Sequence, residues 1–79
     1  MTIKIKVLES GYPETLEERV NDFLNVLEYE PLRITFSNTF ETVSDDNRVE
    51  YYPRYTAIIE YYAAPKNVEA VAAYEAMMK

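Results

Sequence analysis

The sequence predicts a small α+β domain with the element order β-α-β-β-α. Residues 2–8 alternate between polar and apolar side chains, and apolar residues recur at helical spacing between positions 16 and 27. Two further alternating segments flank a polar turn at residues 44–47. With 79 residues, the chain has room for one domain, expected to span residues 1–79. We expect a three-stranded sheet, one covering amphipathic helix and a docking C-terminal helix.

The first element is predicted to be a half-buried strand. Ile3, Ile5 and Val7 point to one side, and Lys4 and Lys6 point to the other. Because the apolar side of such a strand normally faces the core, we expect the isoleucines and the valine to lie under the first helix.

The second element is predicted to be an amphipathic helix of about 14–16 residues. Gly11 supplies backbone freedom for the preceding turn, and Pro13 suits the first helical position. The helix should end before Pro31. Its apolar stripe consists of Leu16, Val20, Phe23, Leu24 and Leu27.

The second and third strands follow, joined by the polar turn. The second strand runs from about residue 32 to 37, and to Val43 if Phe40 continues the alternation. Pro53 interrupts the third strand, so that strand either begins after Pro53 or has a bulge or an edge there. We expect the third strand at the centre of the sheet because it is the longest and most apolar. Its predicted core side carries Val49, Tyr51, Tyr55, Ala57, Ile59 and Tyr61.

The composition argues against catalysis and against bound metals or cofactors. The chain has no cysteine and no histidine, which excludes thiolate and imidazole chemistry and the corresponding metal ligands. Its single glycine excludes a glycine-rich phosphate loop. The one adjacent aspartate pair, Asp45 and Asp46, lies in the polar turn, where solvent keeps both side chains hydrated. We therefore expect a protein that is not an enzyme and has no cofactor.

The net charge and the hydropathy pattern limit which kinds of partner and which cellular compartment the sequence favours. The net charge of −6 disfavours binding to a nucleic-acid backbone. No apolar run approaches the roughly 18 residues that a membrane span requires. The N-terminal alternation is not a signal-peptide core. We expect a cytoplasmic protein that does not engage a membrane.

One predicted sheet surface gathers basic and aromatic side chains. If the apolar side of each strand lies under the first helix, the other side carries half of the chain's basic residues. Three interpretations stay open for this surface: it is covered by the C-terminal helix or a second subunit, it binds an acidic protein, or it binds a small anionic ligand or nucleotide. The candidate binding residues are Lys4, Lys6, Arg33, Arg54, Tyr52 and Tyr62.

The tail at residues 66–79 is predicted to be an alanine-rich helix. A short helix of this kind is marginal alone in water, so it should dock on its own sheet or on a neighbouring chain. A domain this small often completes its core by association, and we expect a homodimer. The candidate contacts on the tail are Val68, Val71, Tyr74 and Met78.

Three segments together suggest a family resemblance. The sequences IKIKV at residues 3–7, LEERVNDFL at 16–24 and YTAIIEY at 55–61 resemble a family of short sporulation-associated proteins. Such proteins occur in spore-forming bacteria and in phages and prophages of Gram-positive hosts. The resemblance covers residues 3–62 and implies a small accessory protein, but it implies no activity and no functional residues.

The sequence thus favours a non-enzymatic interaction protein, of phage or prophage provenance, that binds a host macromolecule. One alternative is a binder of small anions or nucleotides on the basic surface. Another is an acidic mimic of DNA, in which carboxylates along the first helix imitate phosphates. Those carboxylates are Glu14, Glu17, Glu18, Asp22 and Glu28.

Overall fold

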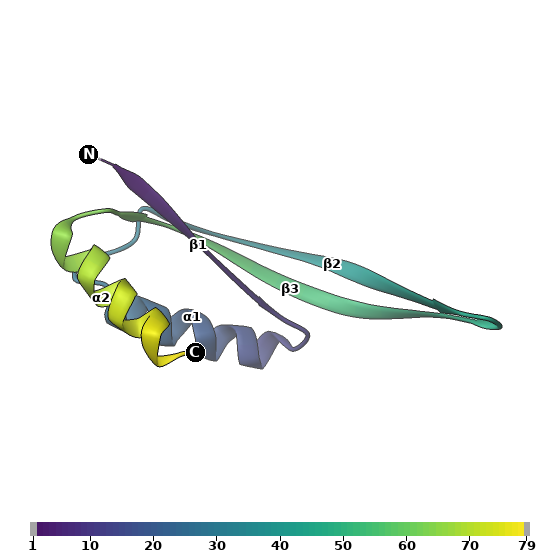
Figure 1. Cartoon of the computed structure of the whole chain (residues 1–79). Coiled ribbons are helices and arrows are strands. Elements are labelled where there is room, and N and C mark those ends of the chain that lie inside the picture. Colours follow the sequence, from purple (N-terminus) through teal and green to yellow (C-terminus); the bar gives the residue numbers. More distant parts are fainter. Residues whose placement is uncertain (1, 79) are drawn as a thin grey trace.

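The computed structural model describes residues 2–78 and shows three strands in one sheet with two helices. The predicted α+β class and the order β-α-β-β-α are confirmed (Figure 1). The elements are β1 (Ile3–Ser10), α1 (Pro13–Val26), β2 (Arg33–Asp45), β3 (Arg48–Tyr62) and α2 (Pro65–Met77).

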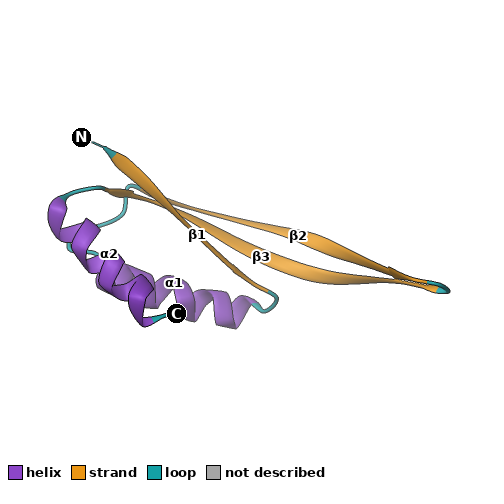
Figure 2. Cartoon of the chain, in the orientation of Figure 1, coloured by secondary structure: helices purple, strands orange, loops and turns teal. Residues whose placement is uncertain are grey.

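The sheet has the order β1-β3-β2, and both neighbouring pairs are antiparallel. The prediction that the third strand lies at the centre is confirmed. β1 stops at Ser10, opposite Tyr55, whereas β2 and β3 remain paired out to Asp45 and Arg48. Residues 39–54 therefore form a two-stranded hairpin without a third strand, which we call the arm. Figure 2 shows the arm extending well past the helices.

β3 passes through Pro53 without interruption and pairs it with Phe40. At this position β1 has already ended, so β3 has no neighbour on that side. Proline is tolerated in a strand at such an edge position, because an edge leaves backbone N–H groups unpaired in any case. Of the alternatives left open by the sequence, the edge is the one observed.

Both helices lie on the same side of the sheet (Figure 2). The centre of the core is Phe23 of α1, which is fully buried. Its ring meets the edge of Tyr61 at 5.5 Å between centroids and stacks on Tyr74 of α2 at 5.8 Å. The sequence left open whether the C-terminal helix docks on its own chain or on a neighbouring one, and in the structure it packs on its own chain, against α1. The other buried apolar residues are Leu16, Val20, Ala57, Ile59, Tyr61 and Val71.

A buried asparagine joins the two helices to the sheet. The Asn67 side-chain amide donates a hydrogen bond to the Tyr62 carbonyl at 2.8 Å. Its side-chain oxygen accepts one from the Glu28 backbone N–H, also at 2.8 Å. Because Tyr62 is the last residue of β3 and Glu28 lies beyond the end of α1, Asn67 supplies a hydrogen-bond partner to a backbone group at the end of each element. It thus fixes the start of α2 against the end of β3 and the segment after α1.

The orientation of β1 differs from the sequence prediction. Lys6 lies opposite Ile59 and Ile5 lies opposite Glu60. Directly opposed residues of an antiparallel pair share one face, and Ile59 is buried under the helices. Lys6 is therefore on the helix-covered face, and the expectation that Ile3, Ile5 and Val7 lie under the first helix is wrong.

Lys6 is accommodated on the helix-covered face because its ammonium group and its methylene stem have different surroundings. The Lys6 ammonium lies 3.1 Å from the Glu75 carboxylate and 5.9 Å from the centre of the Phe23 ring. Its stem packs along apolar surface while the charge stays at the rim, as long cationic side chains often do. This arrangement places the apolar side of β1 on the opposite, open face of the sheet.

Candidate protein-interaction surfaces

The predicted basic surface is not formed. Lys4 and Lys6 face the helices, whereas Arg33 and Arg54 pair in register with Glu60 and Thr39 on the open face. The prediction that these four cations converge is therefore wrong. It failed because β1 has the opposite orientation, while the faces expected for β2 and β3 are correct.

The two tyrosines assigned to that surface do lie on the open face. Tyr62 is opposite Ile3, at one end of the sheet, and Tyr52 is opposite Glu41 in the arm. The Tyr52 hydroxyl donates a hydrogen bond to the Glu50 carboxylate. That bond, with a smaller contribution from desolvation, raises the pKa of Tyr52 above its ordinary value.

The tail residues proposed as oligomer contacts divide into two pairs. Val71 is buried in the core, and Tyr74 stacks on Phe23, so both are engaged within the chain. Val68 and Met78 are exposed. Whether these two contact a second chain stays a prediction.

The open face carries an apolar patch that neither α1 nor α2 covers. β1 contributes Ile3, Ile5 and Val7, which are 52%, 60% and 52% exposed. β3 contributes Ile58, opposite Val7, and Tyr62, opposite Ile3. We call these five residues the open-face patch. Contiguous apolar surface of this kind on a small protein commonly marks a contact with another molecule.

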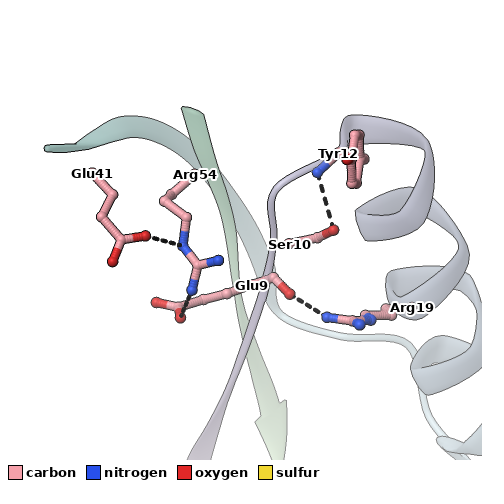
Figure 3. Close-up of polar contacts among 6 residues, drawn as sticks. All are labelled: Glu9, Ser10, Tyr12, Arg19, Glu41 and Arg54. Atoms are coloured by element: carbon pink, nitrogen blue, oxygen red, sulfur yellow. Dashed lines mark hydrogen bonds and ion pairs between the residues drawn. The ribbon is translucent and has the colours of Figure 1, made fainter. Parts of the chain in front are cut away.

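Ion pairs lie within the open-face patch and beyond one end of it. Glu60 lies opposite Ile5, between Ile58 and Tyr62 on β3, and pairs with Arg33 at 3.6 Å. Beyond Val7, Arg54 lies between Glu9 and Glu41, at 3.9 Å and 3.8 Å (Figure 3). Three carboxylates and two guanidinium groups thus adjoin an apolar strip along β1, and protein interfaces commonly combine such apolar and polar parts.

The end of β1 also connects the sheet, the arm and α1. The Arg19 guanidinium of α1 donates a hydrogen bond to the Glu9 carbonyl, and the Tyr12 N–H donates to the Ser10 hydroxyl at 3.1 Å (Figure 3). Because the Glu9 side chain pairs with Arg54 at the base of the arm, these contacts hold the helix and the arm base around one strand end.

The arm has two chemically different sides. Opposed residues alternate between the sides, so the register alone assigns each one. One side faces the same way as the helix-covered face and has no charged residue; we call it the aromatic side. Phe40 and Tyr51 on that side are 67% and 66% exposed. The aromatic side carries Phe40, Thr42, Ser44, Val49, Tyr51 and Pro53, and the other side carries Thr39, Glu41, Val43, Asp45, Arg48, Glu50, Tyr52 and Arg54.

An apolar groove continues the aromatic side into the body of the molecule. It lies between α1 and the sheet, with a volume of about 260 Å³. Leu16 and Val20 of α1 line one wall, and Phe36 and Tyr55 line the other. Phe36 and Phe40 lie on the same face of β2, with Asn38 between them. The groove is thus shaped to receive an apolar side chain of a molecule that contacts the arm.

The titratable groups give no sign of tuned acid–base chemistry. The one buried group with a shifted pKa is Tyr61, among residues 2–78. Burial, reinforced by the Glu75 carboxylate and opposed by Lys6, raises its pKa above the ordinary value. Across the same residues no group of three or more carboxylates is arranged to hold a metal ion. None of the described helices is long and apolar enough to cross a bilayer.

No known protein family, curated protein or solved structure matches this chain. The resemblance to sporulation-associated proteins, and the phage provenance it implies, therefore stay predictions. The class that fold and surfaces define is a small α+β protein with an open-faced sheet and a projecting β-hairpin arm.

Sequence reasoning missed both apolar surfaces. For the arm, a signal was present: the alternation on either side of the turn at residues 44–47 extends well beyond the length of the first strand. An unequal strand length leaves part of a hairpin without a third strand. For the open-face patch there was no comparable signal, because β1 reads as half-buried in either orientation.

Proposed function

We propose that this chain is a non-enzymatic protein-binding protein, and that the aromatic side of its arm contacts the partner. The observation that carries the proposal is the arm itself: a free-standing hairpin with exposed aromatic rings on one side and every charged strand residue on the other. Aromatic residues with large exposed area are the usual anchors of protein interfaces.

The shape of the molecule supports this proposal. The chain exposes 6043 Å², compared with about 5,000 Å² expected for a compact monomer of this mass. Its radius of gyration is 15.4 Å, compared with about 12 Å for a compact chain of this length. A two-stranded hairpin is marginally stable in water by itself. The arm keeps apolar side chains in water in the isolated chain. A partner that covers these side chains would account for the elongated shape.

The chemistry of the arm indicates what kind of partner fits. Two exposed rings and the adjoining groove present apolar surface without a cation, which does not suit a phosphate backbone. A fully exposed aromatic side chain that becomes buried removes about 150–250 Å² from water. Phe40, Tyr51 and Phe36 are 67%, 66% and 62% exposed, so together they account for about half of one partner's share of a standard interface. The expected partner surface is therefore apolar, uncharged protein.

The proposal is tested by capturing the partner with matched variants. Tagged wild-type protein is incubated with a lysate of the organism that encodes it, alongside Phe40→Ser/Tyr51→Ser and a control, Val43→Ser/Tyr52→Ser. Val43 and Tyr52 are also exposed but lie on the charged side of the arm. We expect a protein, identified by mass spectrometry, that binds the wild type and the control and is lost with the aromatic-side variant.

Far-ultraviolet circular dichroism and melting curves of both variants should match the wild type, because all four side chains are exposed. Equal capture by both double variants, or no protein captured by the wild type above the bare tag, would contradict the proposed function.

A further inference from the structure

We infer that the open-face patch is the contact between two copies of this chain, packed face to face about a twofold axis. This contact is distinct from the aromatic side of the arm, which lies on the other face of the sheet. The test of the dimer is therefore independent of the test of the proposed function.

The first argument is that no helix or strand among residues 2–78 covers the patch. The C-terminal helix packs beside α1 instead, where Val71 is buried and Tyr74 stacks on Phe23. Ile5 and Val7 are consequently half exposed in the isolated chain. A β-sheet with an apolar open face normally packs that face against another layer.

The charge distribution favours self-association through this face over self-association through the helices. The chain carries a net charge of −6, so copies repel one another unless their acidic parts are kept apart. The exposed carboxylates of α1, among them Glu14, Glu18 and Asp22, lie on the opposite face. Sheets pack about 10 Å apart and a helix is about 10 Å thick. Face-to-face packing thus separates the two α1 axes by about 30 Å, roughly three times the screening length.

The charged side chains in and beside the patch already have partners. Glu60, between Ile58 and Tyr62, pairs with Arg33, and Glu9, beyond Val7, pairs with Arg54. A second copy meeting this face therefore buries no unpaired charge. Because both copies present the same surface, the apolar strip along β1 of one copy meets that of the other, as a twofold contact requires.

The area of the open face limits the expected affinity of the dimer. Three strands of about eight residues occupy roughly 14 Å by 26 Å, a footprint of about 400 Å². Stable specific interfaces bury about 800 Å² of accessible surface on each partner. An open-face dimer is thus small, even with some contribution from the base of the arm. We expect a reversible dimer with a dissociation constant in the range of about 1–100 μM.

The test measures mass against concentration by sedimentation equilibrium of the full chain between about 5 and 500 μM. The wild type should move from the 9.3 kDa of one chain toward twice that mass. Ile5→Lys/Val7→Lys should weaken the dimer by at least about tenfold. This variant reduces the net negative charge, so added repulsion between chains cannot explain the loss.

The matched control is Phe40→Lys/Tyr51→Lys, which makes the same charge change on the aromatic side of the arm. It should retain the wild-type dimer, and both variants should keep the wild-type circular dichroism at low concentration. A wild type that stays monomeric at 500 μM, a patch variant that still dimerises, or equal loss in the control would each overturn the inference.

A second measurement distinguishes face-to-face packing from pairing of β1 edges. The chain has no cysteine, so a single introduced thiol is the only cross-linking site. Ile5→Cys lies on the open face and Lys4→Cys on the helix-covered face of the same strand. A short bismaleimide should link Ile5→Cys dimers and leave Lys4→Cys monomeric. Comparable linking of both variants would indicate edge pairing and overturn the inference.

Discussion

The helix-covered body and the arm are built from the same two strands but differ in what holds them together. In the body, Ala57 and Ile59 of β3 are completely buried under the helices. In the arm, no residue from 39 to 54 belongs to the core or packs against it. Burial of apolar area dominates folding stability. The body should therefore supply nearly all of the free energy of folding, and the arm should be stabilised mainly by what it binds.

The comparison is tested most severely by truncating one phenylalanine in each region. Phe23→Ala removes a fully buried ring that contacts Tyr61 and Tyr74. We expect a loss of about 3–5 kcal/mol in the free energy of unfolding, enough to leave a domain of this size largely unfolded at ambient temperature. Phe40→Ala, in the arm, should cost no more than about 0.5 kcal/mol.

Urea unfolding followed by circular dichroism measures both variants. A Phe40→Ala cost close to that of Phe23→Ala would show that the arm is part of the folding unit. That result would contradict the division between body and arm.

Two asparagines, one in the body and one where β2 enters the arm, allow the same comparison for polar side chains. Asn67→Ala leaves the Tyr62 carbonyl and the Glu28 N–H without the partners that now lie at 2.8 Å. An unsatisfied buried polar group costs about 1–3 kcal/mol. Asn38→Ala, at an exposed position where β2 enters the arm, is the control and should change the free energy of unfolding by less than about 0.5 kcal/mol. Equal effects of the two variants would rule out the proposed role of Asn67.

Most of the fold could be predicted because its elements have strong local periodicity. The spacing of Leu16, Val20 and Phe23 fixed α1, and Pro13 and Pro31 bounded it, in agreement with a helix from Pro13 to Val26. The central place of the third strand followed from its length and its apolar content, and the docking of the tail followed from the instability of a short free helix.

The candidate site could not be predicted because it depends on the face of one strand. An alternation of period two gives two sides but does not say which side the helices cover. Lys6 reached the covered face because Glu75 pairs with it and because its stem packs over the ring of Phe23. These contacts come from α1 and α2, distant in sequence, so inspection of residues 3–7 alone favours the wrong orientation.

Removing the arm tests the same division from the other direction. Thr39 and Arg54 are register partners, so replacing residues 40–53 by Asn-Gly closes the hairpin with a two-residue turn. We expect the free energy of unfolding to change by less than about 1 kcal/mol, because the deleted hairpin is marginal by itself and its Glu41–Arg54 pair is exposed. Calorimetry should show one transition at nearly the wild-type temperature. A broad transition would mean that the arm supports the body.

The smallest expected effect is a pH dependence confined to the body. Burial raises the pKa of Tyr61 above its ordinary value near 10, so the folded state holds the phenol proton more tightly than the unfolded state. The contribution of Tyr61 to the free energy of unfolding is therefore fully present below about pH 10. It is lost as the pH rises through the pKa of the folded state.

Tyr61→Phe removes only the hydroxyl, so the variant and the wild type should have similar melting temperatures at pH 7. The variant should then lose less stability between pH 9 and 11, since all other groups are common to both proteins and cancel in the comparison. Tyr51→Phe, which removes an exposed hydroxyl in the arm, is the control. Identical pH profiles of all three proteins would show that Tyr61 is not desolvated, and that the packing of Phe23 against it is looser than the structure shows.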